Sequence, residues 1–161
     1  MAKYFFDTNL FVYMFDRRDG EKQAKAHAKV RSCIQNGNGV ISTQVLQEYA
    51  SVALVKLQHP AVAVLRELKI FESFEIVQLT PELIRGGVEL FGEKQLHFWD
   101  ATILAAAEHA GCEVLYSEDF QAGTAYGNVR AENPLFGDNY FSGLTTITTR
   151  NVTPAHFSCR K

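Results

Sequence analysis

The 161-residue chain contains little that would place it in a membrane, in a secretory pathway or around a zinc ion. No apolar run approaches the roughly 18 residues that a membrane-spanning helix needs, and Asp7 interrupts the first apolar stretch, which argues against a secretory signal. Three widely separated cysteines supply neither a disulfide framework nor a metal-ligand pair, and the five histidines show no HxH or HExxH spacing. We therefore expect a cytoplasmic protein without membrane contact, disulfides or zinc.

An excess of positive charge is also absent, since 16 Lys and Arg stand against 18 Asp and Glu, a net charge of −2. This balance argues against a protein covered in positive charge for non-specific DNA binding, although a local basic patch suffices for other nucleic acids. Apolar residues, in contrast, are plentiful at 47% of the chain, which is enough for one well-packed domain.

Strand-like and helix-like segments alternate along the first 130 residues. Buried strands are expected at 3–7, 40–41, 76–79, 114–116 and 128–130. Helices are expected at about 21–34, 43–57, 60–71, from 81 onward, and 98–111. This alternation is typical of an α/β domain whose parallel sheet is covered by helices on both faces. Residues 137–161 lack periodicity, and we expect an irregular tail there.

Four acidic residues stand at positions where acids are destabilising or where ligands bind. Asp7 follows the first strand and Asp119 follows the fourth, and ligands of open parallel sheets bind beyond these carboxyl ends. Glu48 and Asp100 each interrupt the apolar face of a helix. A turn, a helix cap (for Asp100 in particular) or a satisfied core polar group explains any one of them alone. Four together are more simply explained by convergence on a divalent cation.

Carboxylates packed together repel one another unless a metal ion neutralises them. Oxygen ligands without Cys or His favour Mg²⁺ or Mn²⁺ over zinc, and such a cation assists phosphodiester hydrolysis. Glu48 is expected to be either a ligand or a residue that positions water. The principal metal ligands are expected to be Asp7, Asp100 and Asp119. The residues expected to hold the carboxylates by hydrogen bonds are Thr8, Asn9 and Ser117.

These motifs resemble those of PIN-domain nucleases, and among them the VapC toxins of bacterial toxin–antitoxin pairs. The matching segments are 6–9, Glu48, 98–101 and 117–120, in the right order and spacing within residues 3–136. The resemblance implies a three-layer α/β/α PIN-like fold with a central parallel sheet of strand order 3-2-1-4-5. It implies a nuclease domain over residues 1–136, followed by a tail over 137–161 that has no counterpart in the resemblance.

The resemblance also implies a metal-dependent endoribonuclease that hydrolyses RNA, forms a homodimer and is neutralised by a co-expressed antitoxin protein. Arg17 and Arg18 are candidate contacts to RNA phosphates, although a solvated charge cluster with neighbouring acids explains them equally well. Lys22, Lys25 and Lys29 share one helix face, which is either an RNA-facing stripe or an ordinary exposed face.

Two other functions stay open. An aspartate-nucleophile phosphatase of the haloacid dehalogenase type would use Asp7, but such enzymes have a second aspartate where Asn9 stands. A PIN-like module that binds RNA or protein without cleavage is less favoured, because all four acids are present. The aromatic residues, Trp99 included, are expected to belong to the core.

Overall fold

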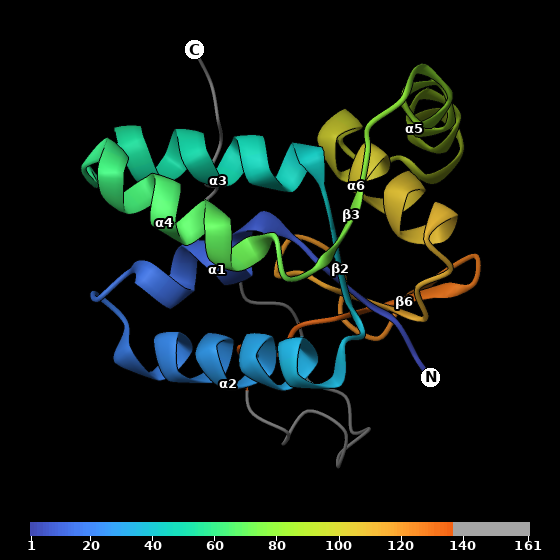
Figure 1. The fold of residues 1–161 in the computed structure, drawn as a ribbon. Helices are drawn as coiled ribbons and strands as arrows, with labels where there is room; N and C mark the ends of the chain where they lie inside the picture. Colours follow the sequence, from blue (N-terminus) through green and yellow to red (C-terminus); the bar gives the residue numbers. More distant parts are fainter. Residues whose placement is uncertain (137–161) are drawn as a thin grey trace, which may run out of the picture.

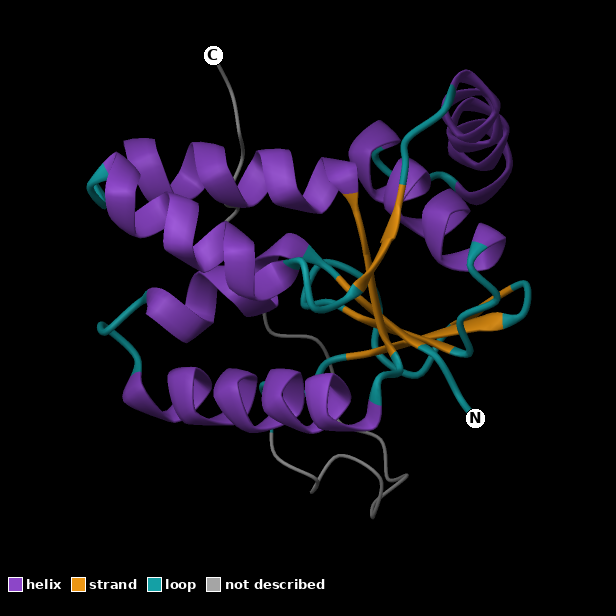
Figure 2. Cartoon of the chain, viewed as in Figure 1, coloured by secondary structure: helices purple, strands orange, loops and turns teal. Residues whose placement is uncertain are grey.

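The computed structural model describes residues 1–136, which form one sheet flanked by helices (Figure 1, Figure 2). Its parallel strands are β1 (Tyr4–Phe6), β2 (Gly39–Ser42), β3 (Glu75–Val77), β4 (Val114–Tyr116) and β6 (Val129–Glu132). A short strand, β5 (Ala125–Tyr126), pairs antiparallel with β6 at the edge. The tail expected at 137–161 lies outside the described residues.

The strand order is β3-β2-β1-β4-β6-β5. The predicted order 3-2-1-4-5 is confirmed for the parallel part, because the fifth strand expected at 128–130 is β6. The edge strand β5 was not predicted; it exists because Gly127, at a φ of 61°, turns the chain back onto β6. In this order β1 lies between β2 and β4, so the residues that follow β1 and β4 meet at one edge of the sheet.

Six helices of the described chain connect these strands. They are α1 (Thr8–Phe15), α2 (Gly20–Asn36), α3 (Thr43–Val55), α4 (Ala61–Phe71), α5 (Pro81–Lys94) and α6 (Phe98–His109). In Figure 1, α1 to α4 gather to the left of the strands and α5 lies beside α6 at the upper right. Because crossovers between parallel strands are right-handed, the helices before β3 and those after it cover opposite faces. The predicted α/β/α architecture is therefore confirmed.

Polar caps mark where four of these helices begin, and Asp19 caps α2 by accepting the backbone N–H of Lys22 at 3.0 Å. Asp7 caps α1, and its Oδ1 accepts the backbone N–H of Thr8 at 2.6 Å. Ser42 caps α3, and Thr80 caps α5 with Pro81 at the first helical turn. The alternative role of Asp100 as a cap is wrong, because His97 holds the N-cap position of α6 and Asp100 lies in its first turn.

Aromatic side chains fill the core beside β1, as expected for most of them. Phe11 packs against Phe71 and Phe74 with ring centroids 4.3 and 5.6 Å apart, and Phe6 packs against Phe74 at 5.3 Å. The expectation for Trp99 is wrong, because this side chain is 61% exposed. The first turn of α6 projects past the part of the helix that packs in the interior, which begins at Ala101.

A close contact between α5 and α6 fixes the position of α6. A Cβ atom built on Gly87 would lie 2.4 Å from Cγ2 of Thr102, so only glycine fits there. Thr102 is itself 1% exposed and takes part in the hydrogen bonds of the candidate site.

Within residues 1–136, no helix is long and apolar enough to cross a membrane. Cys33 and Cys112 are buried free thiols, and burial raises the pKa of Cys112 to about 12. Cys159 lies beyond the described part of the chain.

Candidate active site

Asp7 lies at the junction of β1 and α1 and is only 5% exposed. Its Oδ1 accepts the N–H of Thr8, and its Oδ2 accepts the hydroxyl of Ser117 at 2.6 Å. Its own backbone N–H donates to the carbonyl of Tyr116, the last residue of β4, at 3.0 Å. The pairing of β1 with β4 thus brings Asp7 beside the turn formed by residues 117–119.

Asn9 connects Asp7 to Asp119. Its Nδ2 lies 3.4 Å from Asp7 Oδ2, 3.4 Å from Ser117 Oγ and 3.2 Å from Asp119 Oδ2. The backbone N–H of Asp119 donates to Ser117 Oγ at 3.0 Å. The buried Oδ1 of Asn9 has no partner among the described residues, so three oxygens around Nδ2 decide how the amide is oriented.

Glu48 reaches the same region from α3. Its Oε2 accepts the hydroxyl of Thr8 at 2.9 Å, and its Oε1 accepts Nε2 of Gln44 at 2.8 Å. Thr8 therefore holds two acids at once, Asp7 through its N–H and Glu48 through its hydroxyl. The apolar helix face predicted around Glu48 is incomplete, because Val45 is buried whereas Val55 is 72% exposed.

Gln44 and Thr102 were missed from the sequence. Gln44 donates to the carbonyl of Trp99 at 3.1 Å, and its Oε1 accepts the hydroxyl of Thr102 at 2.6 Å. Both polar side chains are almost fully buried, and they join α3 to the first turn of α6, which carries Asp100. The spacing of four residues between Gln44 and Glu48 was a readable signal, whereas the link to Thr102 spans 58 residues.

Burial and mutual repulsion raise the pKa of two of the acids. Burial raises the pKa of Asp7 to about 8, with the charges of Asp119 and Glu48 adding to it and the Ser117 hydrogen bond opposing it. Burial likewise raises the pKa of Asp100 to about 6, again with contributions from Asp119 and Glu48 and opposition from His97. Because Asp7 and Asp100 each interact with both other acids, the structure brings the four predicted acids within reach of one another's charge.

The side chains of this cluster offer the oxygen ligands that a hard divalent cation prefers. All four side chains offer carboxylate oxygens, and a positive charge would relieve the repulsion that raises two of their pKa values. As the carboxylates are placed, no three His, Cys, Asp or Glu side chains of residues 1–136 surround one point closely enough to hold a metal ion. Both oxygens of Asp7 and of Glu48 accept hydrogen bonds from neighbours, so a cation would have to compete with these donors.

Arg17 and Arg18 lie at the opposite end of α1 from Asp7, about 12 Å along the helix axis. The guanidinium of Arg18 forms a two-pronged ion pair with Asp16, with Nη2 at 2.6 Å from Oδ2. Both arginines line a hollow of about 730 Å³, and none of the four acids lines it. Contact between these arginines and RNA stays a prediction, and it would take place away from the acids.

The three lysines on one face of α2 contact β4 and the segments that follow β4 and β6. Lys22 contacts Glu118, Lys25 donates to the carbonyl of Leu135, and Lys29 donates to the hydroxyl of Tyr116. The expectation of an ordinary exposed face is wrong for these half-buried lysines, whereas contact of this helix face with RNA stays a prediction.

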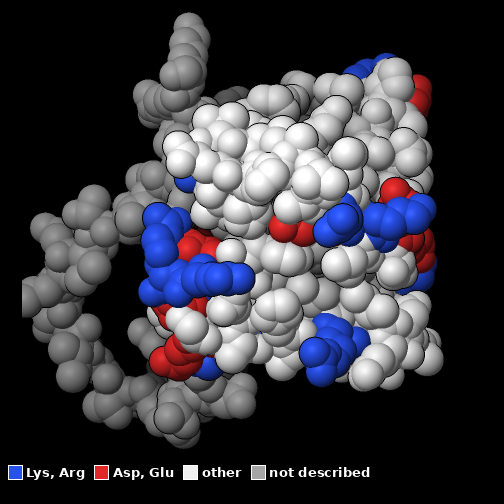
Figure 3. All heavy atoms as spheres, turned by 60° about the vertical axis from the view of Figure 1, so that its left-hand side comes forward, with Lys and Arg blue, Asp and Glu red and all other residues white. Residues whose placement is uncertain are grey.

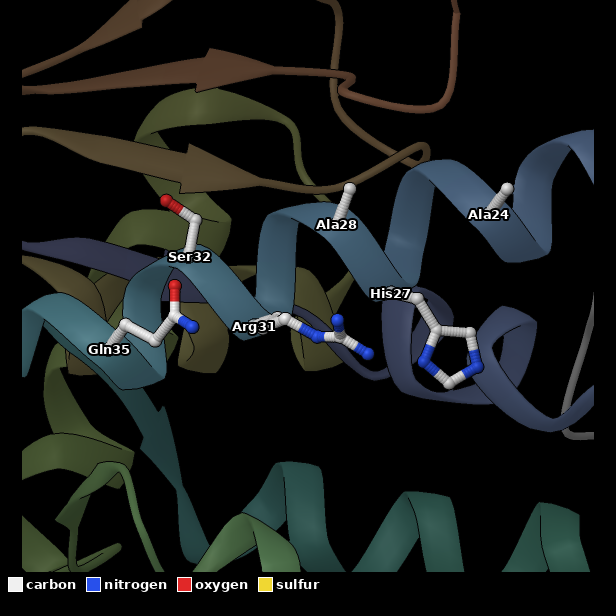
Figure 4. Close-up of a pocket in the computed structure, with 6 residues that line it drawn as sticks. All are labelled: Ala24, His27, Ala28, Arg31, Ser32 and Gln35. Atoms are coloured by element: carbon white, nitrogen blue, oxygen red, sulfur yellow. The ribbon is translucent and has the colours of Figure 1, made fainter.

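A second hollow in the part of the chain that the structure describes is likewise lined by none of the four acids. The hollow of about 410 Å³ in Figure 4 is lined by side chains of α2 alone, among them His27, Arg31 and Gln35. Figure 3 shows positive and negative side chains next to one another on the face that includes the left-hand side of Figure 1, without a broad basic surface.

Comparisons with known proteins agree with this architecture. The family model of the PIN domain matches residues 4–125. The fold is similar to that of VapC20 of Mycobacterium tuberculosis, described as a toxin that cleaves the sarcin–ricin loop, at 20% identity and a TM-score of 0.62, covering 80% of this chain and 99% of that one. A toxin–antitoxin complex from Klebsiella pneumoniae is 23% identical, with a TM-score of 0.60, covering 79% of this chain and 95% of that one.

VapBC2 of Rickettsia felis, bound to a DNA fragment from its promoter, is 20% identical, with a TM-score of 0.61, covering 82% of this chain and 98% of that one. At these identities the likeness shows the fold. A comparison with curated proteins gives no match. The family model spans β1 to β4 and includes all four acids, and on this ground the chain belongs to the PIN-domain family.

Proposed function

We propose that this protein is an endoribonuclease that hydrolyses phosphodiester bonds in RNA with Mg²⁺ or Mn²⁺, and that it acts as the toxin of a toxin–antitoxin pair. The observation that carries the proposal is the gathering of Asp7, Glu48, Asp100 and Asp119 at one edge of a PIN-domain sheet. It is supported by the similar fold of a toxin described as cleaving the sarcin–ricin loop, and by toxin–antitoxin complexes of the same fold.

The four carboxylates would hold the divalent cation, which supplies positive charge against the phosphate and lowers the pKa of a nearby water molecule. The chain's own groups determine where the carboxylates lie. The Thr8 N–H and the Ser117 hydroxyl orient Asp7, and Asn9 keeps Asp119 beside it. Glu48, held by Thr8 and Gln44, is either a further ligand or the residue that orients the attacking water.

The first prediction tests this activity. Purified protein is expected to cut a structured RNA with Mg²⁺ or Mn²⁺ and to stop when EDTA is in excess. Asp7→Asn is expected to lose cleavage by about 100-fold or more while it remains folded, because the cation loses a ligand. Asp16→Asn, which changes a buried carboxylate at the other end of α1, is the control and keeps its activity. Cleavage that persists in EDTA or in Asp7→Asn contradicts the proposal.

A symmetric homodimer and an antitoxin partner complete the proposal. Apolar side chains recur on α5 at spacings of four and three residues, where Ile84, Val88 and Phe91 are 40–55% exposed. Trp99, at 61% exposed, adds to the exposed apolar surface. We call Ile84, Val88, Phe91 and Trp99 the apolar stripe. An exposed apolar surface of this kind is typical of contacts between protein chains.

A further inference from the structure

A second polar cluster joins α1, α2 and the turn that follows β4. The hydroxyl of Tyr13 donates to Glu118, with its oxygen 2.9 Å from Oε1 and 3.2 Å from Oε2. Nζ of Lys22 lies 3.0 Å from the Tyr13 oxygen and 3.4 Å from Glu118 Oε2. The same ammonium lies 4.4 Å from the centre of the Tyr13 ring. We call Tyr13, Lys22 and Glu118 the clamp.

The clamp holds the turn that carries Asp119. Asn9 and Tyr13 are four residues apart on α1 and therefore lie on the same helix face. From this face Asn9 donates to Ser117 and Asp119, while Tyr13 donates to Glu118. Three consecutive residues of the turn are thus bound to one face of α1, and Lys22 adds a bond from α2.

Asp119 depends on this support because its own side chain is weakly held. Asp119 is exposed, and among the described residues its carboxylate accepts a hydrogen bond from the neutral amide of Asn9. Glu118 would add a fifth negative charge beside the four acids, and the ammonium of Lys22 offsets it.

The surroundings strengthen the ion pair inside the clamp. The side chains of Lys22 and Glu118 are 25% and 19% exposed, so water screens their attraction less than that of a surface pair. Lys25, three residues further along α2, is similarly placed at 31% exposed but pairs with Glu21 and the Leu135 carbonyl. Lys25 therefore provides a matched control that leaves the turn untouched.

We propose that the clamp is a positioning device that fixes the 117–119 turn against α1 and α2, and so keeps Asp119 beside Asp7 for cation binding. The last step rests on the proposed function, since it requires that the acids bind a cation. The first step, the fixing of the turn, does not.

Hydrogen exchange without RNA or added metal tests the first step. The Asp119 N–H, which donates to Ser117 Oγ, is expected to exchange about fivefold to tenfold faster in Tyr13→Phe and in Lys22→Met, the factor that loss of one hydrogen bond corresponds to. Lys25→Met and Lys22→Arg are expected to exchange as the wild type does, and amides of β1 act as the folding control. Glu118→Gln, which keeps the side-chain shape, replaces any variant that fails to fold. Unchanged exchange at Asp119 in the clamp variants overturns the proposal.

Calorimetric titration with Mn²⁺ tests the second step on the same proteins. Removing a nearby positive charge would by itself strengthen cation binding, so a purely electrostatic role predicts tighter binding by Lys22→Met. The clamp predicts the opposite, a loss of about tenfold in Mn²⁺ affinity for Lys22→Met and a similar loss for the uncharged change Tyr13→Phe. Tighter binding by Lys22→Met overturns the positioning role. A wild type that binds no Mn²⁺ overturns the proposed function instead, and the exchange result then decides the clamp alone.

Discussion

Asp7 belongs both to the first helix and to the acidic cluster. A helix cap needs only a side-chain oxygen near the first free N–H groups, which an exposed serine or aspartate provides. Asp7 is instead buried, with a pKa raised to about 8 by that burial and by Asp119 and Glu48. Capping alone does not explain why an acid is buried where its ionised form is destabilised. Its burial next to two other acids therefore supports the role in cation binding that we propose for it.

The raised pKa of Asp100 predicts a pH-dependent gain when it is replaced. Its pKa is about 6 in the folded protein against the ordinary 3.8, so its destabilising charge is absent below about pH 4 and complete above about pH 6. Stability of the wild type in EDTA therefore falls as pH rises through this window. Asp100→Asn removes this charge, so the free energy of unfolding measured with urea at pH 7 is expected to rise by about 1–2 kcal/mol.

Asp16→Asn is the control, with the opposite sign. Its hydrogen bond from Arg18 lowers the pKa of Asp16, so the stability it contributes is present above its unfolded-state pKa and is lost as pH falls through the folded-state value. Asp16→Asn is thus expected to unfold more easily at pH 7. Added Mn²⁺ is expected to stabilise the wild type more than Asp100→Asn. A lower urea midpoint for Asp100→Asn at pH 7 in EDTA would show that these acids do not repel one another.

The four acids were readable from the sequence for simple reasons. Asp7 and Asp119 follow strands whose ends meet in a parallel sheet, and Glu48 and Asp100 each stand among the apolar residues of a helix. The bonds of Gln44 to Thr102 and of Tyr13 to Glu118 were not readable, because each joins the side chains of separate elements, and no strand-end rule places these residues together. Such pairs depend on how each helix is rotated against its neighbours, which periodicity does not specify.

The helices α1, α3 and α6 direct their first turns toward the same edge of the sheet. Asp7 caps α1, Asp100 lies in the first turn of α6, and Glu48 follows one turn into α3. The positive ends of the helix dipoles partly offset the carboxylate charges there. The placement of α6 depends in turn on α5, through the contact of Gly87 with Thr102.

Two adjacent glycines of α5 predict opposite effects of one substitution. At Gly86 an added Cβ meets only Ala105 at 3.8 Å, so Gly86→Ala is expected to stabilise the protein by about 0.5–1 kcal/mol through helix propensity. At Gly87 the same atom would lie 2.4 Å from Thr102 Cγ2, and Gly87→Ala is expected to destabilise by about 1–3 kcal/mol. Urea unfolding of both variants measures the difference. Equal stability would show that α5 does not pack closely on α6.

Prediction of the helices and strands succeeded for most elements and failed for the shortest strand, β5. The helices α2 to α6 and strands β1 to β4 lie within a few residues of their expected ranges. The strand β5 has two residues, Ala125 and Tyr126, too few for alternation to be visible, and it depends on the turn at Gly127. The start of α6 at Phe98 was predicted, and only the alternative role of Asp100 as its N-cap was wrong, because His97 holds that position without a side-chain hydrogen bond.

The molecule presents surfaces of two kinds to possible partners. Figure 3 shows charges of both signs on the face that includes the left-hand side of Figure 1. The apolar stripe on α5 and Trp99 has a different character, since its side chains are large, apolar and 40–61% exposed. With a net charge of only −2 on the chain, charge repulsion does little to prevent two copies from meeting. A second copy covering this stripe is the homodimer of the proposed function.

Light scattering at micromolar concentration is expected to give about twice the chain mass of 18.1 kDa. Phe91→Glu places a charge in the apolar stripe and is expected to shift the protein to a monomer, because an unpaired buried charge opposes association. Glu89→Lys, an exposed change on the same helix outside the stripe, is expected to leave the mass unchanged. Trp99 is the single tryptophan, so its fluorescence should move to shorter wavelength as the dimer buries it. A wild type that stays monomeric excludes the dimer, and a dimeric Phe91→Glu with unchanged fluorescence places the contact away from α5.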